Sequence, residues 1–173
     1  MLVLVRHAHA GSKRRWPGPD LERPLSPRGR AQAQDLAALL ADLRVTRLLS
    51  SPALRCRQSL APASEQLWVP VEPVGVLAAD APVEDLVRFL GSPDLRGAAL
   101  CTHGETLQAL SEAWESPWRS LTGSPAPDLS GTPKGACWVV ENYGTPDMTV
   151  RNPLPGHLLD RFRSPGVHAR GSR

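Results

Sequence analysis

The sequence predicts a single α/β domain built around a mainly parallel β-sheet. Three short apolar runs, at residues 2–5, 45–49 and 98–101, are typical of strands that are covered on both faces. A segment with helical spacing follows each run along the chain, which is typical of a sheet flanked by helices. The length of 173 residues suits one ordinary domain. We therefore expect a three-layer sandwich with helices on both sides of a central sheet.

The first strand is followed by a long loop and then by a helix. Residues 8–25 hold three prolines and two glycines and are expected to form a loop, and loops of that length in compact domains are usually functional. Ser26 followed by Pro27 is a typical helix start, because the hydroxyl caps the first turn and proline tolerates the first helical position. Leucines at helical spacing extend the expected helix over 27–43.

The second strand, at 45–49, leads into a second helix. Ser51 and Pro52 repeat the same start signal, and the helix that they open carries Arg55. Pro62 is expected to kink or restart this helix, because proline removes a backbone donor from the helical ladder.

The second half of the chain continues the alternation with shorter elements. Residues 69–76 are extended but broken by prolines, which indicates an edge of the sheet. Residues 116–133 are rich in Pro, Gly and Ser and are expected to form a loop. The other expected elements are a helix at 83–90, a strand at 98–101, a helix at 105–114, and strands at 136–140 and 148–150 separated by a turn around Gly144.

Composition argues against several classes of protein. No apolar run approaches the roughly 18 residues of a membrane span. The first ten residues place apolar side chains before charged ones, the reverse of a secretory signal. Three cysteines without a C-x-x-C pair indicate neither a disulfide framework nor a cysteine-rich zinc site. We expect a cytoplasmic protein with no membrane partner; the sequence leaves its oligomeric state open.

Charge is distributed unevenly along the chain. Residues 1–60 hold 11 Lys and Arg against 4 Asp and Glu, a net charge of +7, whereas residues 61–150 hold 4 against 12, a net charge of −8. The basic first third indicates an anionic partner, either nucleic acid or a phosphorylated small molecule. Residues 152–173 are basic and rich in Pro, Gly and Arg, a composition that favours a disordered tail beyond a domain at 1–151.

Polar side chains follow the buried strands at the points where the strands end. Arg6 and His7 follow the first strand, Arg55 follows the second, and His103 follows the third. In a parallel sheet these ends share one edge, where α/β proteins bind their ligands. Arginine forks match phosphate oxygens, and a neutral imidazole can attack phosphorus while a second one donates a hydrogen bond to a phosphoryl oxygen.

Three segments resemble the signature segments of the histidine phosphatase superfamily, which has the phosphoglycerate-mutase-like fold. They are L-V-R-H-A at 4–8, S-S-P-A-L-R-C-R-Q-S at 50–59 and C-T-H-G-E at 101–105. E-R-P-L-S-P-R-G-R-A-Q-A at 22–33 looks like a stretch of the small SixA-type branch. A-G-S-K at 10–13 and P-K-G-A-C-W-V-V at 133–140 are similar to the phosphatase half of actinobacterial proteins that join it to a Nudix domain. The resemblance covers roughly residues 2–141.

The resemblance implies a metal-independent phosphatase that needs no cofactor and works through a covalent phosphohistidine. His7 would attack phosphorus, water would then release phosphate, and Arg6, Arg55 and His103 would form the pocket around the phosphoryl group. The residues by themselves point to the same four side chains. The resemblance adds Ser12 and Lys13 as phosphate contacts. Arg28 is a further candidate phosphate contact because it lies near a helix start, although solvated surface charge is the favoured interpretation.

The proton donor to the leaving group is not identified by the sequence. Larger relatives carry a glutamate that acts as the general acid, in an insertion that this chain lacks. The carboxylates available here are Asp80, Glu84 and Glu105, and Asp80 is the favoured candidate. Without a strong acid, an alkoxide is a poor leaving group. We therefore expect phosphohistidine proteins, acyl phosphates or phosphoanhydrides such as nucleotides to be preferred over sugar phosphates.

Other functions compete with this one. One is phosphoglycerate-mutase-type phosphoryl transfer, which is disfavoured because the chain lacks insertions that would cover the phosphohistidine from water. Another is a catalytically silent phosphate-binding module. Nucleic-acid binding through Arg14 and Arg15 is disfavoured because only Trp16 offers a stacking platform there. The sequence also predicts core or loop-anchoring roles for four tryptophans and small buried roles for two cysteines: Trp68, Trp114, Trp118, Trp138, Cys56 and Cys101. Of the tryptophans, Trp118 is the candidate for stacking on a ligand ring.

Overall fold

A six-stranded sheet forms the centre of the molecule. The computed structural model describes residues 1–151, and the tail expected at 152–173 lies outside the described residues. The strand order is β3-β2-β4-β1-β5-β6, with β1, β2, β3 and β4 parallel and β5 antiparallel to both of its neighbours. The strands are β1 (Leu2–Arg6), β2 (Arg47–Ser50), β3 (Val71–Pro73), β4 (Ala98–Thr102), β5 (Cys137–Glu141) and β6 (Thr149–Arg151). The predicted mainly parallel sheet is confirmed, with β3 at an edge.

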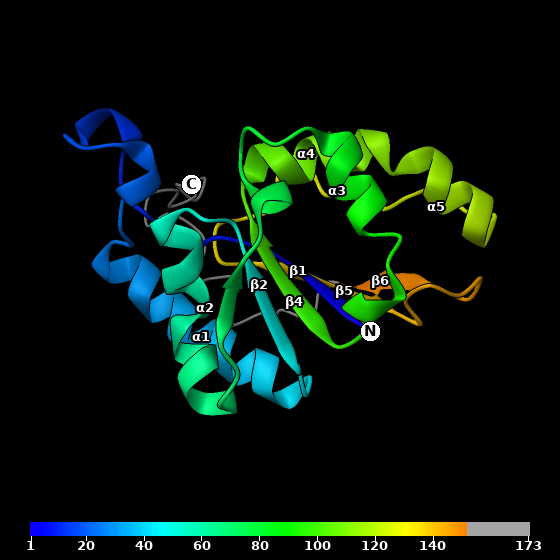
Figure 1. Cartoon of the computed structure of the whole chain (residues 1–173), viewed down its shortest axis with the longest axis horizontal. Coiled ribbons are helices and arrows are strands. Elements are labelled where there is room, and N and C mark those ends of the chain that lie inside the picture. The colour runs from blue at the N-terminus through cyan, green and yellow to red at the C-terminus, as the bar shows by residue number, and fades with distance from the viewer. Residues whose placement is uncertain (152–173) are drawn as a thin grey trace, which may run out of the picture.

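Helices cover both faces of this sheet, which makes the three-layer sandwich that the sequence predicts. Figure 1 shows α1 and α2 on one side of the strands and α3, α4 and α5 on the other. The helices are α1 (Pro27–Asp42), α2 (Leu54–Leu67), α3 (Val83–Phe89), α4 (Gly104–Ala113) and α5 (Glu115–Thr122). Short 3-10 turns are η1 (Lys13–Arg15), η2 (Asp20–Glu22), η3 (Gly75–Leu77) and η4 (Pro93–Leu95).

Alternation along the buried strands divides the core in two. In β1, Val3 and Val5 pack with α1 and α2, whereas Leu2 and Leu4 pack with α3, α4 and α5. Because successive side chains of a strand point to opposite faces, an unbroken apolar run fills both interfaces at once. The run at 2–5 therefore forms a central strand that is covered on both faces.

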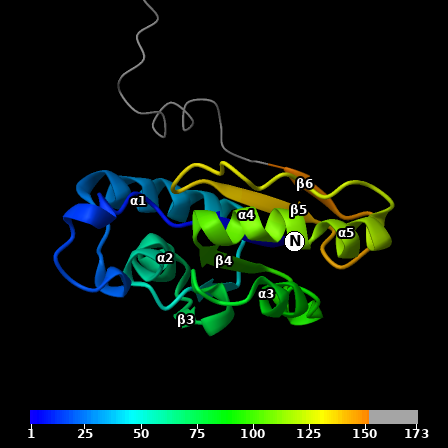
Figure 2. The same ribbon diagram turned by 90° about the horizontal axis from the view of Figure 1, so that it is seen from above.

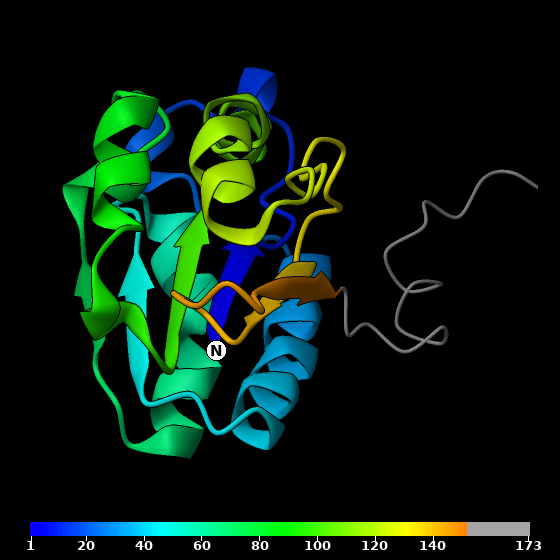
Figure 3. The same ribbon diagram turned by 90° about the vertical axis from the view of Figure 1, so that its right-hand side faces the viewer.

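The carboxyl ends of the parallel strands meet at one edge of the sheet. In Figure 3 the arrowheads of β1 and β4 point toward the same edge, where the loop that carries η1 and η2 also lies. Figure 2 places this loop at one end of the molecule and α5 at the opposite end. Residues that follow β1, β2 and β4 are thus brought together from distant parts of the chain.

The start expected for the second helix is wrong. The structure starts α2 at Leu54, with Ala53 at the cap position, and not at Ser51-Pro52. The Ser51 hydroxyl instead bonds His103 and accepts from the Ala53 amide, so this residue supports the site. The helix also runs through Pro62 without a restart, and the alternative of a kink at Pro62 stays a prediction. Its buried neighbours Leu60 and Ala63 pack in the core shared with α1, and this tertiary packing outweighs the donor that proline removes.

Two other expectations are corrected near the tryptophans. The predicted loop at 116–133 begins with helix α5, which Gly123 ends in the left-handed conformation at a φ of 72°. The helix is held by an ion pair between Glu115 and Arg119 and by Trp118 packing on Trp114. Trp68 is no core residue: it ends α2 in the left-handed conformation and is 93% exposed.

Within the described part of the chain, no helix is both long and apolar enough to span a bilayer. The expectation of a cytoplasmic location stays a prediction.

The start of α1 is packed against the loop that follows β1 at the site. Ser26 caps the helix as predicted, with its hydroxyl accepting from the Gly29 amide at 3.1 Å. A Cβ on Gly29 would lie 2.0 Å from the carbonyl oxygen of His9, so only glycine allows this approach. The same interface is held by the His9 amide, which donates to the Gln32 side chain at 2.8 Å.

We predict that Gly29→Ala destabilises the protein by about 1–3 kcal/mol, because the new methyl group forces backbone apart in a packed interface. The sign is opposite to that of an ordinary helical Gly→Ala change, which stabilises by about 1 kcal/mol. Urea unfolding followed by circular dichroism measures the difference. Gly75→Ala is the control, since a Cβ there meets nothing within 4 Å. Equal stability of the two variants would contradict the prediction.

Candidate active site

Four polar side chains meet at the carboxyl edge of the sheet. Arg6 is the last residue of β1 and His7 follows it, Arg55 is the second residue of α2, and His103 lies between β4 and α4. The rings of His7 and His103 are 5.3 Å apart, with an angle of 67° between their planes. Arg55 contacts both imidazoles. The convergence that we inferred from strand ends is what the fold produces.

The hydrogen bonds of His7 define its tautomer. Nδ1 lies 2.8 Å from the Ala8 carbonyl oxygen, which only accepts, so Nδ1 carries the proton. Nε2 accepts from Arg55 Nε at 3.3 Å. The lone pair of Nε2 therefore faces the guanidinium, at the place where an anionic ligand is expected. The Ala8 amide is in turn held by the Ser59 hydroxyl at 2.9 Å, which keeps this turn of backbone in position.

His7 is neutral at physiological pH. Burial lowers the pKa of its imidazole to about 3, and the charges of Arg55 and Arg6 act in the same direction. The hydrogen bond to Ala8 opposes this shift without reversing it. A neutral ring in a cationic environment is a nucleophile, because protonation would remove the lone pair that attacks.

His103 is held from two sides. Its Nδ1 accepts from Arg55 Nη2 at 3.1 Å, so its ring proton is on Nε2, which faces the Ser51 hydroxyl at 2.8 Å. The ring is 1% exposed. Cys56 Sγ lies 3.6 Å from the same Nε2, and both Cys56 and Cys101 are fully buried, as predicted. His103 thus enters the site with a fixed ring orientation.

Arg55 connects the two imidazoles to the long loop. It is 4% exposed and donates through Nη1 to the Asp20 carbonyl at 2.7 Å, while its Nη2 lies 3.1 Å from Asp20 Oδ2. Arg23 binds the other carboxylate oxygen of Asp20 at 2.7 Å and donates to the Ala10 carbonyl at 2.8 Å. The loop is therefore fastened to the site at Asp20 and Arg23.

Asp20 is a carboxylate at neutral pH. Burial raises the pKa of its carboxyl, but the hydrogen bond from Arg23 and the charges of Arg55 and Lys13 more than offset this, so the pKa lies below its ordinary value. Sequence reasoning missed Asp20 and Arg23. A signal was present, because an Asp and an Arg three residues apart in a loop between glycines and prolines can form a local ion pair.

Arg6 presents a donor without a partner. Its Nη1 donates to the Thr132 carbonyl at 2.6 Å, whereas its Nε is buried and has no hydrogen-bond partner among residues 1–151. A Cβ on Gly104 would lie 2.5 Å from Arg6 Cζ, so the guanidinium rests directly on the backbone that follows His103. Since a buried donor without a partner is costly, this nitrogen marks a place for an anionic oxygen.

The other predicted phosphate contacts lie farther out. Lys13 is exposed and reaches the site only through Asp20, whose Oδ2 is 3.9 Å from its Nζ. Ser12 is exposed at the start of η1 and borders a surface hollow with Arg14 and Arg15, so the structure does not bring it to the four central side chains. Arg28 is half-buried and its charge acts on His9 and Lys134, which corrects its interpretation as solvated surface charge.

The three candidate proton donors are all exposed. Glu105, in the first turn of α4, is near enough for its charge to oppose the lowering of the Arg6 pKa by burial. Asp80 and Glu84 make no hydrogen bond or ion pair with the site in residues 1–151. Over the same residues, no group of three or more His, Cys, Asp and Glu side chains could hold a metal ion.

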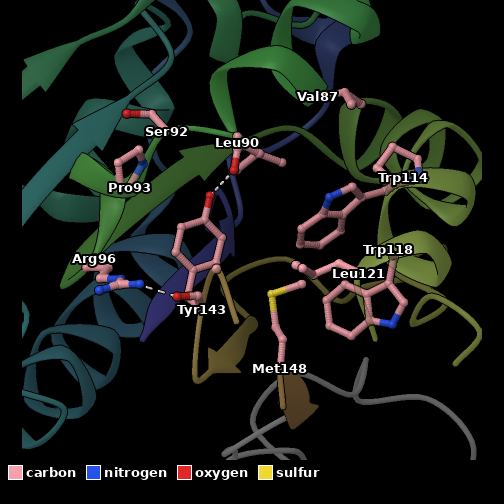
Figure 4. Close-up of a pocket in the computed structure, with 13 residues that line it drawn as sticks. Val87, Leu90, Ser92, Pro93, Arg96, Trp114, Trp118, Leu121, Tyr143 and Met148 are labelled. Atoms are coloured by element: carbon pink, nitrogen blue, oxygen red, sulfur yellow. Dashed lines mark hydrogen bonds between the residues drawn. The ribbon is translucent and has the colours of Figure 1, made fainter. Parts of the chain in front are cut away.

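The tryptophans line a different cavity. A mainly apolar pocket with a volume of about 270 Å³ lies between α3, α5 and the turn before β6. Figure 4 shows Trp114, Trp118 and Tyr143 in its wall. None of the four central residues borders it. Trp118 packs edge-to-face on Trp114 with ring centres 5.1 Å apart and borders this pocket, so its suggested stacking on a ligand ring stays a prediction. Trp138 anchors the loop beside Arg6 by donating to the Thr132 hydroxyl at 2.9 Å.

Comparison with known proteins finds relatives that share this arrangement of elements. The sequence model of the family described as histidine phosphatase superfamily (branch 1) matches residues 2–78. The 8-oxo-(d)GTP phosphatase of Mycolicibacterium smegmatis is 31% identical over 146 residues, which are 80% of this chain and 43% of that protein. The chain thus spans less than half the length of this relative.

Solved structures agree on the fold. The SixA protein of Agrobacterium tumefaciens is 25% identical with a TM-score of 0.64, covering 87% of this chain and 93% of that one. The protein histidine phosphatase SixA in complex with tungstate is 21% identical with a TM-score of 0.64, covering 86% and 92%. In its sheet, in its Arg-His pair after β1 and in the sequence of residues 2–78, the chain is similar to members of the histidine phosphatase superfamily.

Proposed function

We propose that the protein is a phosphatase that transfers a phosphoryl group to His7 and then to water. The observation that carries the proposal is the state of His7, a buried neutral imidazole whose Nε2 lone pair faces Arg55 and which also lies in the field of Arg6. An imidazole kept only for packing needs no such cationic surroundings. We propose Arg6, His7, Arg55 and His103 as the catalytic residues.

The first step forms a bond between His7 Nε2 and phosphorus and breaks the bond from phosphorus to the leaving oxygen, which keeps the electron pair. Arg6 Nε, without a partner, and the Arg55 guanidinium donate to the phosphoryl oxygens as their charge grows. His103 keeps Arg55 aimed at His7 by accepting a hydrogen bond from its guanidinium. In the second step water attacks phosphorus, the N–P bond breaks, and the electron pair returns to Nε2.

The surroundings of the site favour substrates whose leaving group needs little protonation. Asp20, the carboxylate in contact with Arg55, is shared among cations that hold it ionised, which makes it a poor acid. We propose phosphoanhydrides, acyl phosphates or phosphohistidine proteins as substrates. The relatives point the same way, since one is named a nucleotide phosphatase and another a protein histidine phosphatase.

We predict that His7→Ala lowers the rate of phosphate release from p-nitrophenyl phosphate by at least about 10³-fold, because no other group replaces the nucleophile. The wild-type protein should also form an acid-labile phosphoprotein in a single turnover, and the variant should not. The control is Glu65→Ala, which changes an exposed side chain of α2. Equal rates of phosphate release by wild type and His7→Ala would favour a silent binding module. Transfer of the phosphoryl group to a second substrate without hydrolysis would favour a mutase.

We predict that the imidazole of His7 stays neutral from pH 8 down to about pH 5, as followed by ¹⁵N chemical shifts with His7→Gln for assignment. Since the folded pKa lies below the unfolded value of about 6.5, the unfolded chain binds the proton first. The contribution of His7 to stability is therefore complete above pH 6.5 and is lost as the pH falls toward 3. A His7 titration near pH 6.5 would show that the nucleophile is not held neutral by burial.

We predict a steep dependence of kcat/KM on the pKa of the leaving group. Aryl phosphates and phosphoanhydrides should be cleaved at least about 10²-fold faster than a sugar monophosphate, because no strong acid is placed to protonate an alkoxide. A series of substituted phenyl phosphates measures the slope. Asp80→Asn and Glu84→Gln should leave it unchanged. If kcat/KM does not depend on the pKa of the leaving group, a proton donor must assist its departure and the prediction is wrong. A fall in sugar phosphate turnover in either variant would identify that residue as the donor.

A further inference from the structure

A lysine that no charge partner neutralises lies beside the proposed phosphoryl pocket. Lys134 precedes Gly135, whose amide is within 3.0 Å of the Arg6 carbonyl and 3.1 Å of the His7 carbonyl. The loop between α5 and β5 is thus fastened to the strand end that carries the nucleophile. Lys134 is half-buried and, over residues 1–151, makes no hydrogen bond or ion pair.

The charges around Lys134 come from three separate segments. Arg6 ends β1, Arg23 lies in the long loop, and Arg55 lies in α2, and each of them acts on the ammonium group together with Arg28. Burial lowers the pKa of Lys134, and the repulsion from these arginines lowers it further. Like charges collected in a partly buried place raise the free energy of the empty site, and a bound anion relieves this repulsion.

The nearby carboxylates are already committed elsewhere. Asp20 is shared among Arg23, Arg55 and Lys13, and Glu105 acts on Arg6. Neither forms an ion pair with Lys134. One phosphoryl group at His7 would engage Arg6 and Arg55 and would leave the lysine without an anion. A substrate with a second phosphate group supplies the missing negative charge.

We propose that Lys134 is the centre of a second anion subsite, next to the phosphoryl pocket, that binds the second phosphate of a substrate with a terminal diphosphate, such as a nucleoside diphosphate. This rests on the proposed function and narrows its substrate class. The terminal phosphorus bonds to His7 Nε2, the bridging P–O bond breaks, and the departing phosphate keeps the electron pair. Lys134 binds that departing phosphate and stabilises its added negative charge.

Lys134→Ala tests this by separating two kinds of substrate. We expect kcat/KM for a nucleoside diphosphate to fall about 10–100-fold, and kcat/KM for p-nitrophenyl phosphate to change less than about 3-fold. Lys134→Arg should restore most of the loss, because it keeps the charge. Arg88→Ala is the control, since it removes an exposed cation on α3. Equal losses for both substrates, or no rescue by arginine, would overturn the subsite.

A binding measurement tests the subsite without turnover. Methylenediphosphonate, which has two phosphonate groups and no bridging oxygen to cleave, should bind Lys134→Ala at least about 10-fold more weakly than wild type in calorimetry. Inorganic phosphate should bind both proteins within about 3-fold. If the diphosphonate binds both equally while His7→Ala is inactive on p-nitrophenyl phosphate, the subsite is wrong and the phosphatase stands. If the wild type releases no phosphate but the diphosphonate difference is found, the phosphatase is wrong and the subsite stands.

Discussion

The buried guanidinium of Arg55 is the constraint on which the site depends. A charge with 4% exposure must find partners inside the protein, and here they are the two imidazoles and the Asp20 carboxylate and carbonyl. Each partner comes from a different segment of the chain. The requirement to satisfy one cation therefore sets the distance between His7 and His103, fixes the acceptor atom of each ring, and fastens the long loop across the edge of the sheet.

The same crowding of cations explains the electrostatic state of the site. Arg6 and Arg55 act on His7, and Arg6, Arg23, Arg28 and Arg55 act on Lys134. Burial and repulsion together favour the uncharged imidazole, because its protonation would add another cation in a place with little water. The arrangement is costly for the empty protein and favourable for a phosphorylated ligand. The proposed nucleophile and the proposed anion-binding groups thus arise from one cause, the concentration of positive charge at a strand edge.

Packing supports this geometry through glycine and small polar groups. Arg6 can lie against the backbone after His103 because residue 104 has no side chain, and α1 can approach His9 because residue 29 has none. Ser51 and Ser59 hold the second imidazole and the turn after His7. The aromatic pocket between α3 and α5 belongs to the other half of the core and shares no lining residue with the four central side chains.

The sequence by itself determined the order of strands and helices and the four central residues, because buried strands and helix starts are local patterns and the ends of parallel strands share an edge. It also placed Ser26, Trp138 and the buried cysteines correctly. It failed where tertiary contacts outweigh local preference, as at Trp68 and in helix α5. Only the tertiary structure decided that Asp20 and Arg23 hold Arg55, that Lys134 from an acidic stretch of chain joins the arginines, and that His7 is neutral. These depend on distances between segments far apart in the chain and on the exclusion of water around them, which no spacing of residues along the chain encodes.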